Sequence, residues 1–361
     1  LMQLVAYGAQ DIYLTGNPQI TFFKVVYRRH TNFALESIEQ TFNGTVDFGR
    51  KVTCTVSRNG DLIHRTYLQV SLPALTNTGK TVRWVDRVGE VLIDYVNVEI
   101  GGQEIDRHYG DWLTIWNELT QTAEHEDGYS QLIGNTTDLI TAAVSIPAAT
   151  LYVPLQFWFC RNPGLALPLI ALQYHEVKFN VSFRAASECY ITSDGNAPSS
   201  GVPSLGDTAL WIDYIYLDTD ERRQFAQVQH EYLIEQLQYT GAESYSNTSV
   251  KSKLSLNHPC KELVWVLQLD SAAAANAHTD YTDDGDDILA SGKLQLNGHD
   301  RFDERDATYF NVVQPYQHHT RCPATGIYVY SFSLNPEQHQ PSGSVNMSRI
   351  DNATLLLTLN T

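Results

Sequence analysis

The 361-residue sequence is poor in positive charge and in cysteine, and both shortages exclude classes of function. Lys and Arg number 24 against 41 Asp and Glu, so the net charge is -17 at pH 7. A duplex-binding surface requires clustered Lys and Arg, so this composition argues against direct contact with nucleic acid. The five cysteines are an odd number without a Cys-x-x-Cys pair, which argues against a zinc site and a disulfide framework. We expect reduced thiols in or near the core.

Long hydrophobic runs and catalytic signatures are also missing. No apolar run approaches the ~18 residues that a transmembrane helix requires, and no signal peptide is visible. Because the chain opens on Leu1 and not on an initiator Met, we expect that residues preceding it are missing or were removed. Neither a Gly-x-Ser-x-Gly elbow nor a phosphate-binding Gly loop occurs. The 12 histidines never form the His-x-His pattern of a metal-binding cupin. We therefore expect no enzyme activity, no cofactor and no metal.

The acidic stretch 280–287 resembles a calcium-binding loop only superficially. An EF-hand loop that began at Asp280 would place Ser291 at position 12, where that loop needs a bidentate Glu. We interpret the stretch as a solvated acidic loop.

What the chain does contain is an internal repeat. Residues 152–183 and 328–359 are degenerate copies, each with an aromatic run, an Asn-Pro pair, a Gly, an Ile and a closing strand. The closing strands alternate apolar and other residues with the period of two expected when one sheet face is buried. Residues 98–106 match 294–303, and residues 52–56 match 253–256 less clearly. A repeated all-β unit of roughly 150 to 200 residues indicates a sandwich or jelly roll.

The expected elements follow from turn signals and periodicity. We expect strands at 32–42, 50–57, 62–72, 91–100 and 209–217, a helical turn at 11–14, and a second unit that starts with 232–240. Apolar residues at helical spacing predict a short amphipathic helix after Asp111, its N-cap. This helix opens an insertion, 113–150, that with loops 184–208 and 270–287 is expected at the surface. Tyr152 and Tyr328 should occupy equivalent places.

Four segments result from this reading. They are an arm at 1–19, a first jelly roll at 20–217, a linker at 218–229 and a second jelly roll at 230–361. No segment after Thr361 corresponds to 209–217, so we expect the second jelly roll to lack its last strand in this chain.

A family resemblance rests on many short segments. The strongest is Gly8-Ala-Gln-Asp-Ile-Tyr-Leu-Thr-Gly-Asn-Pro18, continued to Lys24; the others are 26–29, 31–33, 57–62, 163–177, 230–237, 314–316, 341–343 and 349–354. Together they resemble the major capsid proteins of large icosahedral double-stranded DNA viruses, especially those of algae and the related iridoviruses. The resemblance covers nearly the whole chain and is weakest in loops 113–150, 184–208 and 270–287.

The resemblance implies a double jelly roll, three copies of which form a pseudo-hexagonal capsomer in the outer shell of a virion. The implied partners are the chain itself as a homotrimer, neighbouring capsomers and minor capsid proteins. The family's chains usually carry a Gly-containing segment before the position of Leu1 and a strand after that of Thr361. The runner-up function is a carbohydrate-binding jelly roll for host attachment, and solution mass distinguishes the two hypotheses.

Two sets of candidate site residues remain. The stretch 22–30 is the most basic of this acidic chain, and Lys24, Arg28 and Arg29 are our candidates for a contact with an acidic neighbouring subunit. For covalent glycans, Asn135 and Asn247 lie in Asn-x-Thr/Ser sequons that fall in expected loops, which makes them the better acceptors.

Overall fold

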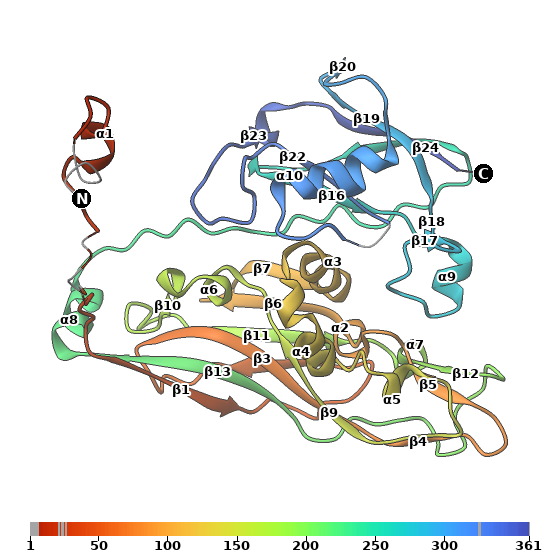
Figure 1. Cartoon of the computed structure of the whole chain (residues 1–361). Helices are drawn as coiled ribbons and strands as arrows, with labels where there is room; N and C mark the ends of the chain where they lie inside the picture. The colour runs from red at the N-terminus through yellow and green to blue at the C-terminus, as the bar shows by residue number, and fades with distance from the viewer. Residues whose placement is uncertain (1–6, 21, 23–24, 26, 324–325, 361) are drawn as a thin grey trace. The chain divides into compact units, whose positions relative to one another are not determined.

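The computed structural model describes residues 7–20, 22, 25, 27–323 and 326–360 (Figure 1). The chain divides into two compact units, residues 1–33 and 34–361. In the first unit, Asp11 accepts a hydrogen bond from the amide of Gly8 at 2.7 Å, and the helical turn α1 (Ile12–Thr15) follows. This turn confirms the one expected at 11–14, displaced by one residue. Its side chains are exposed.

The second unit begins with a jelly roll built of two sheets. One sheet, here the β3 sheet, has the order β1-β13-β3, with β9 and the short β10 also paired to β3; the other, the β6 sheet, has the order β2-β11-β6-β7. The strands are β1 (Phe33–Gln40), β2 (Lys51–Thr55), β3 (Leu62–Leu72), β6 (Ile93–Ile100), β7 (Gln103–Tyr109), β9 (Ala149–Pro154), β10 (Leu167–Pro168), β11 (Val177–Phe183) and β13 (Thr208–Leu217). These strands confirm the five that periodicity predicts.

Alternating side chains explain why the two sheets pack together. In β11, Val177, Phe179, Val181 and Phe183 are each 3% exposed or less, whereas the residues between them are only partly buried. Successive strand residues point to opposite faces, so one face of β11 enters the core. The same core contains residues from β3, β6, β9 and β13. It is the larger of the two jelly-roll cores in the described part of the chain.

The second jelly roll repeats the β6 sheet strand for strand. Its order is β14-β24-β19-β20, with β21 also paired to β19. The strands are β14 (Ser249–Leu254), β19 (Leu289–Leu296), β20 (His299–Asp300), β21 (Arg305–Asp306) and β24 (Ala353–Leu359). Between β19 and β20, Asn297 and Gly298 have φ of 53° and 78°, and Gly101 and Gly102 between β6 and β7 have φ of 61° and 83°. Positive φ at both central residues characterises this tight hairpin turn, so Gly102 and Gly298 are equivalent as expected.

The counterpart of the β3 sheet is incomplete. It consists of β16 (Glu262–Val266) and β22 (Ile327–Ser331), which pair as β3 and β9 do. In the described residues no strand pairs with the other edge of β16, where β13 pairs with β3 in the first jelly roll.

The second jelly roll is expected to start with 232–240, but its first strand in the described residues is β14 (Ser249–Leu254). Residues 229–248 contain no helix or strand. In the first jelly roll, β1 pairs only with β13. The described part of the second jelly roll has no counterpart of β13, so a strand at the position of β1 would have no partner. The segment instead contacts β7, where the amide of Leu237 donates to Asp106 Oδ1 at 3.1 Å.

The expected equivalence of Tyr152 and Tyr328 is also wrong. Tyr328 is fully buried in the core of the second jelly roll. On β9, however, the core residues are Leu151 and Val153, and Tyr152 points to the opposite face, where it contacts the ring of Tyr67. The sequence alignment was displaced by an odd number of residues. Because side chains alternate, such a displacement moves every residue to the other face of the sheet.

The insertion 113–150 is mostly helical and not an exposed loop. It contains most of α3 (Gly110–Thr120), α4 (Ala123–Ile133), α5 (Thr137–Ile140) and β8 (Ser145–Ile146). The helix α3 confirms the expected amphipathic helix, but Tyr109 and not Asp111 is its N-cap. Gly110 starts the helix where it approaches the backbone at Glu90 and Ile93 too closely for any Cβ. Asp111 lies in the first turn, 3.3 Å from Arg184 Nη2.

Short elements connect the main strands. They are β4 (Leu75–Thr76), β5 (Val82–Trp84), α2 (Val88–Val91), α6 (Trp158–Arg161), η2 (Pro163–Leu165), α7 (Ala186–Cys189), β12 (Tyr190–Thr192), α8 (Thr219–Gln227), β15 (Pro259–Cys260), α9 (Asp270–Ala274), β17 (Thr282–Asp283), β18 (Asp286–Asp287), η3 (Tyr309–Val313), α10 (Gln314–His318), β23 (Val345–Asn346) and η4 (Met347–Arg349). No helix among the described residues has the length and apolarity that a membrane span requires.

The five cysteines are free thiols. Cys54, Cys160 and Cys189 are buried and Cys260 is partly buried, as expected for core or near-core thiols. Cys322 is exposed and departs from that expectation. Burial raises the pKa of Cys54 and Cys160 to about 11, so both thiols are protonated at neutral pH.

Candidate assembly surfaces

The junction between the two jelly rolls has an apolar centre. Ile115 and Leu119 of α3 are buried against Tyr281, Ile327 and Val329 of the second jelly roll. Further contributors are the partly buried Trp112, Val264 and Val266. The receiving side chains Val264, Val266, Ile327 and Val329 lie on the face of β16 and β22 opposite to the core of the second jelly roll. The insertion 113–150 therefore supplies the helix that joins the two jelly rolls.

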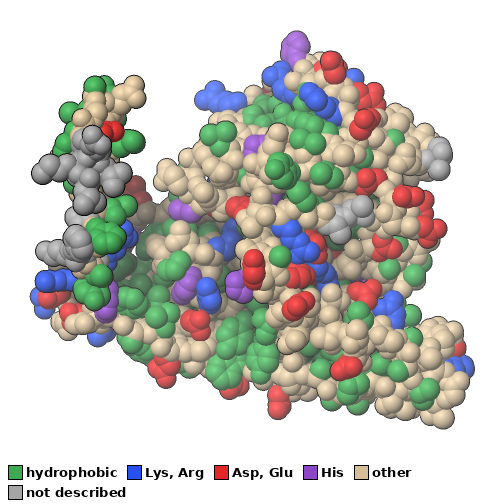
Figure 2. All heavy atoms as spheres, viewed as in Figure 1, with side chains coloured by type: hydrophobic (Ala, Val, Ile, Leu, Met, Phe, Trp, Pro, Cys, Tyr) green, Lys and Arg blue, Asp and Glu red, His purple; other side chains and the backbone are tan. Residues whose placement is uncertain are grey.

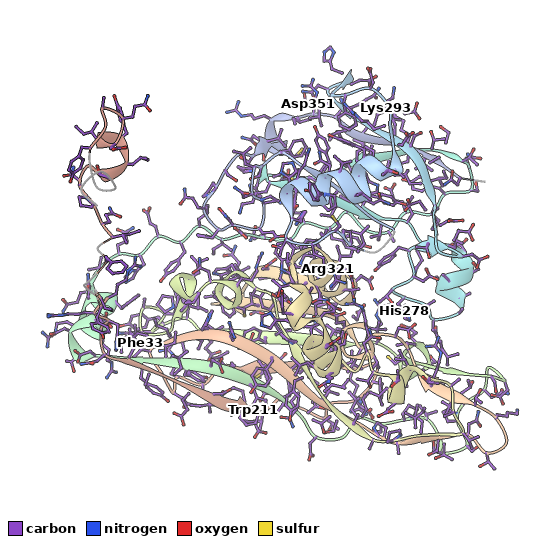
Figure 3. The ribbon with its side chains drawn as sticks, viewed as in Figure 1. Phe33, Trp211, His278, Lys293, Arg321 and Asp351 are labelled. Carbon is purple, nitrogen blue, oxygen red and sulfur yellow. The ribbon has the colours of Figure 1, made fainter. Side chains whose placement is uncertain are left out.

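A charged network extends this junction. Arg321 of the second jelly roll lies beside α3 (Figure 3), and its backbone amide donates to the carbonyl of Leu119 at 3.0 Å. Its guanidinium pairs with Glu126 of α4 and lies 3.4 Å from Glu118 of α3. Glu118 also pairs with Arg87. Arginine is suited to such shared contacts because its planar guanidinium presents several donors at once.

A buried carboxylate anchors α3 to the first jelly roll. Glu90 is fully buried, and its carboxylate accepts hydrogen bonds from Thr114 at 2.8 Å and from the hydroxyl of Tyr129 at 2.5 Å. Burial raises the pKa of Glu90, and Arg87, 3.5 Å away, opposes that shift. The network holds α3 and α4 in place beneath the second jelly roll.

A second set of contacts lies near α9. The amide of Asn276 donates to the carbonyl of Ser187 at 2.8 Å, and a ring nitrogen of His278 lies 2.9 Å from the carbonyl of Glu188. Figure 3 shows His278 between α9 and the first jelly roll. Loops 184–208 and 270–287 thus contribute to the contact between the jelly rolls.

His319 lies between two carboxylates inside the second jelly roll. The ring nitrogens of His319 lie 2.8 Å from Glu262 and 2.9 Å from Glu337, and the side chain is fully buried. Burial lowers the pKa of His319, but the two hydrogen-bonded carboxylates outweigh it and raise the pKa to about 9. Glu262 is on β16 and His319 directly follows α10, so the cluster links two elements of the jelly roll.

The described residues contain no cluster of three or more His, Cys, Asp or Glu side chains arranged to hold a metal ion. Acidic side chains are spread over the visible face of both jelly rolls (Figure 2), in keeping with the net charge of -17.

The predicted site residues differ in their exposure. Arg28 and Arg29 are exposed, whereas Lys24 lies outside the described residues. Asn247 is exposed just before β14, and Asn135 is partly buried between α4 and α5. The junction residues of α3 and Arg321 were not identified as a site from the sequence. The apolar spacing of α3 was visible, but its docking partner lies roughly 150 to 200 residues away in the chain.

The chain matches two family models that together span it almost completely. Residues 21–218 match the model described as major capsid protein N-terminus, and residues 221–361 match the model described as large eukaryotic DNA virus major capsid protein. The chain is 57% identical to the major capsid protein of Pyramimonas orientalis virus, over 99% of this chain and 91% of that protein. It is 49% identical to the major capsid protein of Phaeocystis pouchetii virus, over 99% of this chain and 92% of that protein.

A solved structure extends the similarity to the fold. VP54 of PBCV-1, in a crystal structure fitted into a reconstruction of the virophage Sputnik, superposes with a TM-score of 0.81. The identity is 41%, and the match covers 94% of this chain and 87% of that one. Both halves of the sequence and the fold thus point to the same proteins. The chain belongs to the major capsid protein family of large eukaryotic DNA viruses.

Proposed function

We propose that three copies of this chain assemble into a pseudo-hexagonal capsomer, the building unit of an icosahedral shell. The observation that carries the proposal is the duplicated fold: one chain holds two jelly rolls whose β6-type sheets have the same strand order. Three such chains supply six similar wedges for one ring. We take residues 20–217 and 230–361 as the two wedges, with 1–19 as an arm and 218–229 as the linker.

The role is structural, and its location is the capsid shell of the virion. Membership of a family of capsid proteins supports this role over a carbohydrate-binding protein for host attachment. The same membership supports a function without substrate turnover. Assembly would involve neighbouring capsomers and minor capsid proteins as further partners.

The mass of the purified chain in solution tests the proposal. We expect light scattering coupled to size-exclusion chromatography to give three times the chain mass of 40.6 kDa. A trimer that persists on dilution to low micromolar concentration supports an obligate interface, which buries well over ~2,000 Å² in such assemblies. A monomer that binds glycan arrays would instead favour the carbohydrate-binding alternative.

The basic residues of the stretch 22–30 are proposed as a contact with an acidic neighbour. Arg28 and Arg29 are exposed, and every chain carries a net charge of -17, so copies repel one another at long range. A local basic group offsets that repulsion where it meets acidic side chains. Lys24 belongs to the same proposal by its position in the sequence.

Covalent glycans are proposed at Asn247 and Asn135. The exposure of Asn247 supports it as an acceptor, whereas the partial burial of Asn135 makes access to its amide harder. Peptide mass spectrometry of the protein isolated from virions tests both positions. Unmodified peptides covering Asn247 and Asn135 would refute the assignment.

A further inference from the structure

The helix that docks the second jelly roll has an unrecognised counterpart within that jelly roll. The helical segment 307–318, which includes η3 and α10, follows β21 as α3 follows β7. Both segments bury an aromatic or aliphatic side chain in their own core, Leu113 in the first jelly roll and Phe310 in the second. Aligned by the residues that are buried in both, the pairs are Gly110 with Ala307, Leu113 with Phe310, Thr114 with Asn311, and Asn117 with Gln314.

The polar anchors of the two helices are also equivalent. Thr114 donates to the buried carboxylate of Glu90 at 2.8 Å, and Asn311 donates to Asp287 at 2.8 Å. Each carboxylate lies a few residues before the strand that starts the repeated hairpin, β6 or β19. Asp287 lies 197 residues after Glu90, and Asn311 lies the same 197 residues after Thr114. The two helices therefore sit on their jelly rolls in the same way.

The outer faces of the two helices differ in what covers them. Ile115 and Leu119 are 7% and 0% exposed because they are buried against the second jelly roll. The same alignment places Val312 and Tyr316 at these positions, and they are 47% and 80% exposed. Val313, the equivalent of Trp116, is 36% exposed. The second helix thus presents a docking face without a partner in the described part of the chain.

The receiving surface has a counterpart as well. In the second jelly roll, α3 docks on the outward face of β16 and β22. The corresponding strands of the first jelly roll are β3 and β9, and their outward face carries Tyr67, Gln69 and Tyr152, joined by Trp211 of β13. The rings of Tyr67 and Trp211 stack at 6.3 Å, and the indole of Trp211 donates to Gln69 at 2.7 Å. Figure 3 shows Trp211 on the side of the first jelly roll that faces away from the second.

We propose that the helix face of Val312, Val313 and Tyr316 binds the aromatic face of Tyr67, Tyr152 and Trp211 on a second copy of this chain. The argument for this occupant is that each jelly roll carries both a docking helix and a receiving sheet face. The helix of the first jelly roll and the sheet face of the second are already joined within the chain. This inference rests on the proposed trimer and specifies its interface. A contact in which different surfaces meet is heterologous and generates a ring when its rotation closes. Tyr and Trp are the side chains most enriched at such interface centres.

Two complementary variants test the interface. Tyr316→Asp disables the helix face, and Tyr152→Asp disables the receiving face; Tyr174→Asp is the control, because Tyr174 is 93% exposed and lies on neither face. Thermal melting checks that each variant is folded. We expect each of the two variants to be monomeric where the wild type is trimeric, with an apparent dissociation constant raised at least about 30-fold, as for the loss of a hot-spot residue. The control should remain a trimer.

A mixing experiment distinguishes a heterologous contact from any other. The Tyr316→Asp variant keeps an intact receiving face, and the Tyr152→Asp variant keeps an intact helix face, so one copy of each can join. The two surfaces that remain free in this pair are the disabled ones. An equimolar mixture of Tyr316→Asp and Tyr152→Asp should therefore give a dimer and stop. If Tyr152→Asp does not fold, Tyr316→Asp alone carries the test.

The possible failures are separable. A wild-type chain that is monomeric refutes the proposed trimer. A trimeric wild type with a trimeric Tyr316→Asp variant leaves the trimer standing and refutes this interface. Trimers in the mixture would show that the two faces do not meet, which also overturns the inference.

Discussion

His319 is a buried cation whose two neighbours are carboxylates, and its charge state couples to stability. The pKa of its ring is raised to about 9 from the ordinary value of 6.5. A histidine whose pKa is raised on folding stabilises the folded state fully below pH 6.5, and this contribution is lost as the pH rises through 9. The pKa of Glu337 is lowered, because its hydrogen bonds with His319 and Thr320 outweigh the effect of burial. The contribution of Glu337 to stability is therefore fully present above its ordinary pKa of 4.5 and is lost as the pH falls through its lowered pKa.

We predict that His319→Gln lowers stability most near pH 6. The expected loss is on the order of 2 kcal/mol there, because a raised pKa of this size is a stability difference of that order. Thermal melting from pH 6 to 9.5 should show the curves of the variant and the wild type converging at the alkaline end. His318→Gln serves as the control, because His318 is only partly buried and its ring nitrogen contacts a backbone carbonyl. A constant difference across this range would mean that the histidine acts by packing alone.

The sequence could not predict this cluster. In the sequence His319 is simply the second of two adjacent histidines, and its partners Glu262 and Glu337 lie 57 and 18 residues away. The repeat does not help, because residues that meet only through a tertiary fold leave no periodic signal. Arg321 is a similar case, since Glu118 and Glu126 belong to the other jelly roll.

At the scale of elements, the duplicated helix gives a matched comparison. Leu119→Ala removes a fully buried side chain from the junction and should destabilise the monomer by about 2–4 kcal/mol, from lost burial and the cavity left behind. Tyr316→Ala, at the equivalent position, should change the monomer by no more than about 0.5 kcal/mol, because its side chain is exposed. Denaturant unfolding at concentrations where the chain is monomeric measures both. Equal losses of stability would contradict the observation that Leu119 is buried within the monomer and Tyr316 is exposed.

The unpaired edge of β16 gives a second prediction. In β3 the two edges pair with β9 and β13, whereas β16 pairs with β22 alone in the described residues. Amides of β16 that point away from β22 have no strand to protect them. We expect alternate β16 amides to exchange hydrogen with solvent at least tenfold faster than the central amides of β3. Uniform protection along β16 would show that another segment covers this edge.

Sequence periodicity located the strands and hairpins well and the second helix poorly. Strand alternation and the glycine turns are local signals, so a duplicated all-β unit was predictable from them, and the family resemblance implied the double jelly roll. The second helix was missed because η3 is a turn of π-helix and Pro315 follows in α10, and both disturb the 3.6-residue spacing that revealed α3. The first strand of the second jelly roll lies further along the chain than the expected start at 232–240, because β propensity says nothing about whether a partner strand is present.

For the whole molecule, the basic residues Arg28 and Arg29 should affect assembly and not folding. We predict that Arg28→Glu with Arg29→Glu weakens assembly of capsomers or shells at physiological salt and leaves the melting temperature of the monomer unchanged. Light scattering of the assembling protein measures the effect. The control is Lys251→Glu with Lys253→Glu, two exposed residues whose reversal gives the same net charge. Equally weakened assembly of both variants would mean that the total charge governs assembly, and not the position of Arg28 and Arg29.

The duplicated helix also sets an order in time. The contact made by α3 is intramolecular, and tethered partners meet at an effective concentration near ~1 mM. An identical type of contact between separate chains forms only when the protein itself accumulates. Folding of the double jelly roll is therefore independent of how much chain has been synthesised, whereas formation of the proposed ring would have a threshold. A cell producing the chain would accumulate folded single subunits first and rings later.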